Sequence, residues 1–249
     1  PFDCSFCTSA AYHGKRVRKR DPVHFVDELD RNTRDYGVRD FFFWSDTFTV
    51  DRNQVLGICE ELLRRRLKIR WTCNSRGDTL DADLARMMRR AGCWMVSFGV
   101  ESGDQGILDR SGKRISIEKI RSAIEMTGRS GIQTSGHFVL GLPGETARTA
   151  RATITMAHAL PLDWIQFYGA APWPGSRLFA DAVSQGLLTV DDVWKGISQT
   201  HVRHSLCELS PEELNGLLAE ANGMMYRRAR TWWAALRQAR PSGLLRLLR

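Results

Sequence analysis

The sequence has little cysteine and no long apolar run, and both shortages narrow the classes of protein to consider. None of its apolar stretches approaches the roughly 20 residues that a membrane-spanning helix needs. Its six cysteines follow no regular pairing, which argues against a small disulfide-rich secreted fold and leads us to expect a reducing, cytoplasmic setting. With 43% hydrophobic and 26% charged residues, the 249-residue chain has the composition of a globular domain with a sizeable core.

Two common nucleotide-binding signatures are also missing. No Gly-x-Gly-x-x-Gly follows the first expected strand, and no phosphate-binding lysine follows Gly141-Leu142-Pro143-Gly144. Dinucleotide binding of the Rossmann kind and nucleotide binding by a P-loop are therefore poorly supported.

The most distinctive stretch that is present is Cys4-Ser5-Phe6-Cys7, near the start of the chain. Two cysteines separated by two residues can bind a metal together, and soft thiolate ligands suit zinc or an iron–sulfur cluster. The other four cysteines stand alone and no His-x-His pair is present, so a zinc ribbon or finger is not completed. A redox pair, or two unrelated thiols, is the plain alternative.

Helical and strand-like patterns alternate through the first two thirds of the chain. Helical spacing occurs in residues 21–37, 51–63, 81–91, 116–131 and 144–160, and strand-like runs in residues 40–45, 68–74, 94–100, 132–140 and 163–170. This alternation predicts a parallel sheet with right-handed crossovers, either a barrel or a doubly wound open sheet. Residues 40–45 are almost wholly apolar, which predicts a strand buried on both faces. After Gly186 only helices are expected.

Polar side chains follow several of these strands, and the loops after the strands of a parallel barrel meet on one face. Asp46 follows the first strand, Arg76 the second, and Glu101 and Ser102 the third. The planar guanidinium of Arg76 suits a carboxylate. Asp46 also fits a simple turn cap, and Arg76 a surface salt bridge.

The cysteine pair resembles the last two cysteines of the Cys-x-x-x-Cys-x-aromatic-Cys loop of the radical S-adenosylmethionine (SAM) superfamily. Three further segments, residues 99–103, 138–146 and 171–176, resemble strand-end motifs of that family and occur in the same order. The resemblance implies an α/β fold, a partial (β/α)6 TIM-like barrel over residues 1–180. A helical C-terminal region would occupy residues 181–249. The first strand and the first cluster cysteine would lie upstream of Pro1.

The resemblance also implies roles for individual residues. Cys4 and Cys7 would be metal ligands of a 4Fe-4S cluster. The SAM-binding residues would be Phe6, Asp46, Arg76, Glu101, Ser102, Leu140, Gly141 and Pro172. Phe6 would lie near the adenine, Asp46 near the methionyl amine and Glu101 at the ribose. Asp46 stands where many members carry Gly-Gly-Glu, and its surroundings look like the variant found in cobalamin-associated members.

The activity implied is cleavage of SAM to a 5'-deoxyadenosyl radical, used for methylation, cyclisation or a related change in a small-molecule or lipid-like substrate. The amino-acid sequences of these motifs are most similar to those of the cobalamin-associated methyltransferases and cyclases. That similarity implies a cobalamin cofactor, bound by a domain upstream of this chain. A reductant such as flavodoxin or ferredoxin would supply the electron. The alternatives are a radical SAM enzyme that modifies RNA, and a catalytically dead barrel that acts as a binding module.

The formal net charge of +8 is concentrated in two places, at residues 15–20 and in the arginines from Arg227 to Arg249. Runs of this kind are usually solvated surfaces, so nucleic acid is not the expected partner. The C-terminal segment interleaves arginines with Trp232, Trp233 and several leucines. It fits either a stripe packed on the barrel or a peripheral contact with the inner membrane face.

Overall fold

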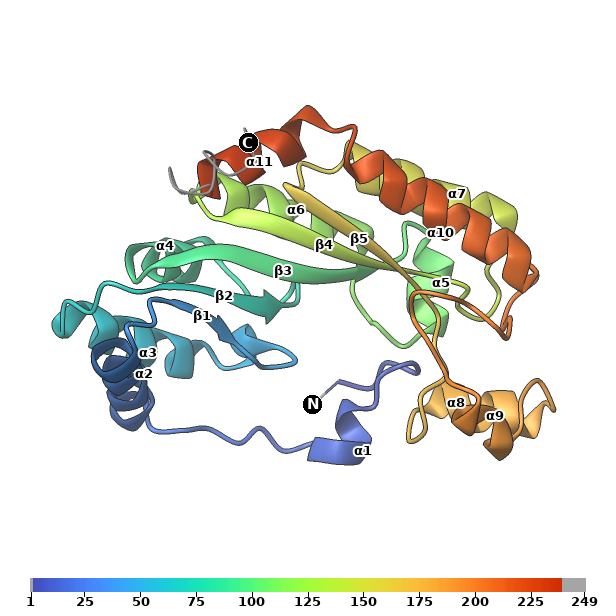
Figure 1. Cartoon of the computed structure of the whole chain (residues 1–249), viewed down its shortest axis with the longest axis horizontal. Helices are drawn as coiled ribbons and strands as arrows, with labels where there is room; N and C mark the ends of the chain where they lie inside the picture. Colours follow the sequence, from blue (N-terminus) through green and yellow to red (C-terminus); the bar gives the residue numbers. More distant parts are fainter. Residues whose placement is uncertain (1, 239–249) are drawn as a thin grey trace.

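Five parallel strands form one curved sheet in the computed structural model, which describes residues 2–238 (Figure 1). The strands are β1 (Asp40–Phe43), β2 (Arg70–Ser75), β3 (Cys93–Glu101), β4 (Gln133–Leu140) and β5 (Trp164–Gly169). Each strand pairs in parallel with the next one along the chain. The predicted alternation is therefore confirmed, and the arrangement is that of a partial TIM-like barrel rather than a doubly wound sheet.

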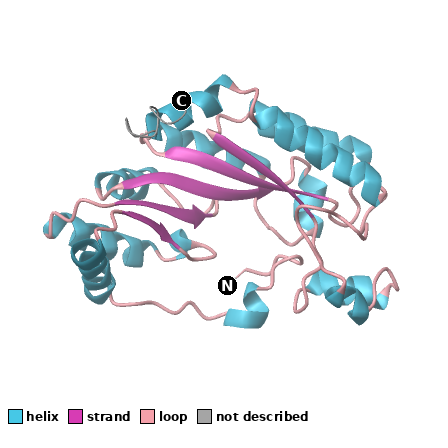
Figure 2. Ribbon diagram, in the orientation of Figure 1, coloured by secondary structure: helices cyan, strands magenta, loops and turns pink. Residues whose placement is uncertain are grey.

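One helix precedes the first strand, four helices cross over between successive strands, and all five cover the outer face of the sheet, as Figure 2 shows. They are α2 (Pro22–Tyr36), α3 (Arg52–Arg64), α4 (Ala82–Arg90), α6 (Ile117–Arg129) and α7 (Ala147–Ala159). Each begins after an N-cap residue whose side chain accepts a hydrogen bond from a backbone N–H of the first turn. The N-cap residues are Asp21, Asp51, Asp81, Ser116 and Thr146. These local signals explain why the sequence predicted the helix starts to within a few residues.

Several shorter elements were not anticipated from the sequence. They are α1 (Ser9–His13), η1 (Phe48–Val50), α5 (Gln105–Arg110) and α8 (Arg177–Ser184). Beyond them come α9 (Val190–Trp194), α10 (Pro211–Met225) and α11 (Ala229–Gln238), so the described part of the chain after Gly186 has helices and no strands, as predicted. Figure 1 places α1, α8 and α9 on the concave side of the sheet, opposite the crossover helices.

The prediction that the first strand is buried on both faces is wrong. Phe43 is buried and stacks on Trp71 at 4.6 Å between ring centroids, but Phe42 is 47% exposed and Trp44 just beyond the strand is 85% exposed. Within residues 2–238, β1 pairs only with β2 and therefore forms an edge of the sheet. One face of this edge strand packs on α2 through Phe25, whereas Trp44 borders an open cavity instead of a second helical layer.

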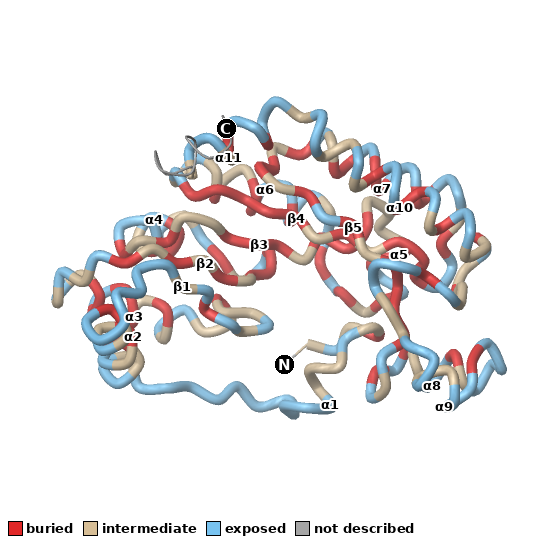
Figure 3. Tube along the Cα trace, in the orientation of Figure 1, coloured by how far each residue is buried: buried red, intermediate tan, exposed pale blue. Residues whose placement is uncertain are grey.

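The core lies between the sheet and the crossover helices, where the buried residues in Figure 3 gather. Trp71, Phe98 and Phe138 are its largest fully buried side chains. Gly92, at the turn into β3, is held at a φ of +97°, and a Cβ there would lie 2.2 Å from the carbonyl oxygen of Ile69. This turn therefore requires glycine, both for its dihedral angle and for the close backbone approach.

The C-terminal helices cover the other edge of the sheet. The side-chain amide of Asn222, on α10, accepts from the Phe167 N–H and donates to the Phe167 carbonyl, both at 3.0 Å. The Gly169 N–H donates to the Gln199 carbonyl at 2.7 Å. These contacts satisfy the free backbone groups of β5 and protect an edge that could otherwise pair with another chain.

The predicted boundary at residue 180 falls inside α8, and residues from Val202 to Ala221 contribute to the main core. The division into residues 1–180 and 181–249 stays a prediction. Pro241 predicts that the last helix is short and separate, and this residue lies outside the described range. Within residues 2–238, no helix combines the length and the apolar character that crossing a membrane requires.

Candidate functional site

A cavity of about 630 Å³ opens at the carboxyl ends of the strands, on the concave side of the sheet. Its volume is in the range of sites that bind cofactors and small molecules. The N-terminal segment forms one wall, and the strand ends form the other. The side chains that concern its chemistry are those of Cys4, Phe6, Cys7, Arg16, Arg18, Asp46, Asn74, Arg76, Glu101, Lys113 and His137.

The cysteine loop is anchored on two other parts of the chain. The Ser5 N–H donates to the Ser111 carbonyl, and the Ser5 carbonyl accepts from the Leu178 N–H, both at 2.8 Å. A turn in which the Cys7 N–H donates to the Cys4 carbonyl at 3.1 Å brings the two cysteines to the same cavity. Gly112, at a φ of +74°, allows the loop to approach, because a Cβ there would lie 2.7 Å from the Asp3 carbonyl oxygen.

The two thiols fit an iron–sulfur ligand pair in donor chemistry and in position. The Cys7 sulfur accepts the Ser9 N–H at 3.4 Å, and the Cys4 sulfur lies 4.0 Å from Nη1 of Arg76. Burial raises the pKa of the Cys4 thiol, while the positive charges of Lys113 and Arg76 act in the opposite direction. Residues 2–238 hold no cluster of three or more metal-ligating side chains, so a third cysteine upstream of Pro1 stays a prediction.

Glu101 lies in the cavity and forms a buried ion pair with Lys113, with 2.7 Å between Nζ and Oε1. Glu101 adopts a φ of +68°, which turns the end of β3 into the site. Gly99 leaves room for the pair, since a Cβ there would lie 2.5 Å from Oε1 of Glu101 and 2.9 Å from Nζ of Lys113. Among residues 2–238, the ion pair and hydrogen bond of this carboxylate use Oε1, which leaves Oε2 to a ligand hydroxyl.

Arg76 also lies in the cavity, but its guanidinium is already paired. Nε and Nη2 donate to the two carboxylate oxygens of Asp78, each at 3.0 Å, and Nη2 also donates to the Lys113 carbonyl at 2.9 Å. The ring of Phe2 stacks 4.0 Å from the guanidinium carbon. Only Nη1, which points toward Cys4, is left for another partner. A bidentate grip on a SAM carboxylate would therefore require Asp78 to move.

Phe6 and Asp46 line the cavity as well. Phe6 packs between two small apolar clusters, one that includes Leu178 and one that includes Leu142. The Asp46 carboxylate accepts a hydrogen bond from the Ser9 hydroxyl, which joins the end of β1 to α1. Both side chains are thus placed where a ligand would reach them.

Four of the predicted cofactor-binding residues do not line the cavity: Ser102, Leu140, Gly141 and Pro172. The Ser102 hydroxyl is fully buried and caps a turn, accepting the Asp104 N–H at 3.1 Å and lying 3.2 Å from the Thr153 hydroxyl. Leu140 belongs to the core. These residues shape the strand ends from behind the cavity, and their contact with SAM stays a prediction.

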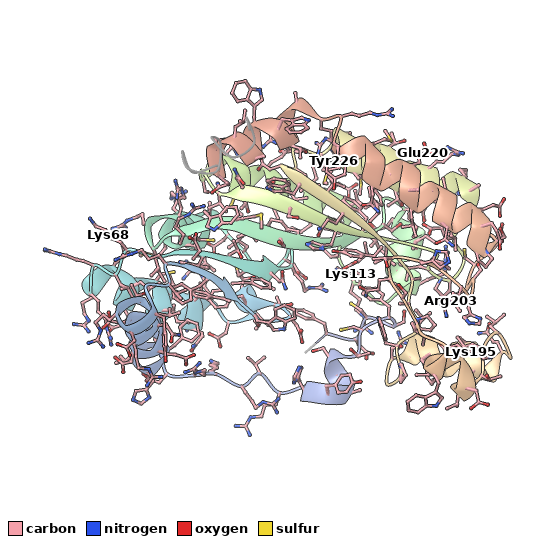
Figure 4. All side chains as sticks on the ribbon, in the orientation of Figure 1. Lys68, Lys113, Lys195, Arg203, Glu220 and Tyr226 are labelled. Atoms are coloured by element: carbon pink, nitrogen blue, oxygen red, sulfur yellow. The ribbon has the colours of Figure 1, made fainter. Side chains whose placement is uncertain are left out.

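Lys113 and His137 are among the cavity side chains that sequence reasoning missed. Lys113 comes from the loop after α5, on the concave side of the sheet (Figure 4), where no strand pattern pointed to a site. His137 projects from the middle of β4 and stacks on Tyr168 at 5.8 Å, and burial lowers the pKa of His137. The alternation of β4 could have indicated that His137 faces inward, but not that it reaches a ligand site.

Comparison with known proteins agrees with this geometry. Residues 1–157 match the sequence profile of the Radical SAM superfamily. The chain is 32% identical over 228 residues to an uncharacterized methyltransferase of Pyrococcus horikoshii, which covers 92% of this chain and 50% of that protein. It is 34% identical over 183 residues to the anaerobic magnesium-protoporphyrin IX monomethyl ester cyclase of Rubrivivax gelatinosus, covering 73% of this chain and 33% of the cyclase.

A solved structure shows the same fold. The radical SAM methyltransferase TsrM of Kitasatospora setae, with cobalamin and a [4Fe-4S] cluster bound, superposes with a TM-score of 0.68 at 22% identity. The superposition covers 74% of this chain and 37% of TsrM, so this chain spans half or less of the relatives described. The matched residues include the cysteine pair and the glutamate at the end of β3. On this evidence, the chain belongs to the radical SAM superfamily.

Proposed function

We propose that this chain is the catalytic domain of a larger enzyme that methylates or cyclises a small-molecule or lipid-like substrate, with cobalamin held by another part of the protein. The observation that carries the proposal is that two cysteine thiols and the buried Glu101–Lys113 pair share one cavity at the strand ends. Family membership implies a 4Fe-4S cluster and SAM as cofactors. Relatives named as a methyltransferase and a cyclase support the reaction class.

Cys4 and Cys7 would hold the cluster, which when bound supplies one electron to SAM. The Glu101 carboxylate would accept hydrogen bonds from the ribose hydroxyls through Oε2. Lys113 donates a hydrogen bond to Oε1 and so fixes the orientation of the carboxylate. Asp46 would accept a hydrogen bond from the SAM ammonium. Phe6 would pack against the adenine from the opposite wall.

Arg76 supports the site in a different way. Asp78 and the Lys113 carbonyl hold its guanidinium beside Cys4, so its charge offsets part of the negative charge that a thiolate ligand brings into a half-buried site. Ser102, Leu140, Gly141 and Pro172 would act through the backbone, by setting the shape of the strand ends.

The partners of the whole enzyme are part of the proposal. Reduction of a cluster requires an electron donor, for which flavodoxin or ferredoxin is suited. A peripheral membrane contact would use α11, where Trp232, Trp233 and Leu236 are 59%, 64% and 49% exposed beside Arg230 and Arg237. Co-sedimentation with vesicles of anionic lipid, compared with neutral lipid, measures that contact directly.

The experiment that tests the enzymatic proposal uses the chain extended upstream through the expected third cysteine, loaded with iron and sulfide without oxygen and then reduced with SAM. We expect 5'-deoxyadenosine to form, and Cys4→Ala or Cys7→Ala to abolish both its formation and the iron–sulfur absorption. Cys59→Ala is the matched control, because this cysteine lies on the buried face of α3, away from the cavity. Methylation also converts a second SAM molecule to S-adenosylhomocysteine, whereas cyclisation needs no methyl donor. Formation of S-adenosylhomocysteine together with 5'-deoxyadenosine therefore indicates methylation, and 5'-deoxyadenosine alone indicates cyclisation.

A fully loaded cluster that cleaves no SAM would contradict the proposal and leave a binding module. So would an unchanged iron content in both cysteine variants, since the thiols in the cavity would then not be the ligands.

A further inference from the structure

A basic segment crosses the open side of the cavity. Residues 15–20, here called the basic strap, lead from α1 to α2 outside any helix or strand, on the concave side of the sheet (Figure 1). The end nearer α2 is fixed to the body of the domain. Lys19 forms an ion pair with Asp51, Arg20 donates to Glu28 at 2.6 Å, and the Gln54 amide donates to the Arg20 carbonyl at 2.6 Å.

Two arginines of the strap line the cavity, and they differ from the other cations there. Arg76 is paired with Asp78 and Lys113 with Glu101. Arg16 and Arg18 are exposed and form no ion pair or hydrogen bond with any residue in the range 2–238.

The charge around the cavity is therefore unbalanced in one direction. Arg16, Arg18, Arg76 and Lys113 line it, against the carboxylates of Asp46 and Glu101 alone. The two paired cations are compensated by neighbouring acids, so the surplus positive charge belongs to the strap. A guanidinium presents paired N–H groups that match the oxygens of a phosphate, phosphonate or carboxylate.

We propose that Arg16 and Arg18 bind an anionic group of the substrate at the open end of the cavity, while the carbon to be modified lies deeper, next to the SAM site. The placement of SAM rests on the proposed function. The substrate is then a small molecule with an apolar body and one oxyanion group. Val17 and Trp44 also line the cavity and would contact the apolar part.

The test is a fluorescence titration of the cluster-loaded protein with three probes that share one ring system: 1-naphthyl phosphate, 1-naphthoate and 1-naphthol. We expect at least one of the two anions to bind roughly tenfold more tightly than the neutral naphthol, and its affinity to fall with rising salt. Which anion binds more tightly distinguishes a phosphate from a carboxylate substrate. The double variant Arg16→Gln/Arg18→Gln should lose this preference, by roughly tenfold in affinity.

Lys15→Gln is the matched control for the single variant Arg16→Gln, because it removes one positive charge from the same exposed strap at a side chain that does not line the cavity. It should keep the preference for the anion. Equal losses in Lys15→Gln and Arg16→Gln would show only general attraction by the basic surface and would overturn the site. Equal binding of all three probes to the wild type would do the same.

Two further readouts keep this inference separate from the proposed function. SAM cleavage in the same wild-type preparation without selective anion binding would overturn the strap site and leave the enzymatic proposal intact. Selective anion binding without SAM cleavage would overturn the enzymatic proposal and leave the anion site on the strap intact. Displacement of the bound anion by transfer RNA at far lower concentration than by inorganic phosphate would identify RNA as the ligand and reject a small molecule.

Discussion

Replacing Glu145 with glutamine tests how the loop after β4 is stabilised. The Glu145 side chain is fully buried between β4 and α7 and does not line the cavity. One carboxylate oxygen accepts the Gly141 N–H, and the other, Oε1, has no hydrogen-bond partner among the described residues. Burial of this half-satisfied carboxyl raises the pKa of Glu145 from 4.5 to about 7.

The sign and the size of the effect on stability follow from this pKa. A carboxyl with a raised pKa holds its proton more tightly in the folded chain than in the unfolded one. Its contribution is therefore most favourable below pH 4.5, declines as the pH rises through about 7, and stays constant above that. The difference between 4.5 and about 7 corresponds to about 3 kcal/mol, because each pKa unit is worth 1.36 kcal/mol.

Glutamine has nearly the same shape and no proton to lose. The free energy of unfolding of Glu145→Gln, relative to the wild type, should rise by about 3 kcal/mol between about pH 4.5 and about pH 8. Urea unfolding at a series of pH values measures this difference. Glu220→Gln, at an exposed site on α10 (Figure 4), is the control and should show no such rise. A difference between Glu145→Gln and the wild type that does not depend on pH would refute the reasoning.

Three other substitutions test the turn into β3, the edge of β5 and the cavity. Gly92→Ala forces a Cβ to 2.2 Å from a carbonyl oxygen at a positive φ and should cost at least about 2 kcal/mol in thermal unfolding. Gly128→Ala, in α6 with open space around it, should be neutral or stabilising by up to about 1 kcal/mol; equal effects would contradict the strain argument. Asn222→Leu leaves the Phe167 N–H and carbonyl unpaired and should cost about 2–3 kcal/mol, with faster hydrogen exchange at that amide; unchanged exchange would count against it. Glu101→Gln should weaken SAM binding roughly tenfold by calorimetry, and undiminished affinity would remove Glu101 from the ribose site.

The order and the limits of the main elements could be predicted because they depend on neighbours along the chain. Asp21, Asp51 and Asp81 cap helices within three residues of their own position, and Gly37 ends α2 in the left-handed conformation. The alternation of such helices with short apolar runs leaves few topologies other than a parallel sheet. The short helices were missed, since five or six residues carry too little periodicity to be recognised.

The burial of β1 could not be predicted in the same way. Its apolar sequence fits a central strand as well as an edge strand, and only the position of the strand in the sheet decides which faces are covered. Phe42 and Trp44 show the outcome, because both remain exposed although their sequence suits a buried strand, and Trp44 borders the cavity.

For the site, the sequence by itself determined the residue types at the strand ends, Cys4 and Cys7 as the thiol pair, and Glu101 as a carboxylate positioned by β3. Tertiary structure alone decided the pairing of these groups. Lys113 pairs with Glu101, 12 residues earlier in the sequence, and Asp78 pairs with Arg76. Among residues 2–238, the cations of the cavity that have no acidic partner are therefore Arg16 and Arg18. The physical reason is that capping and periodicity act within a few residues, whereas an ion pair forms between whichever charges the folded backbone brings within a few ångströms.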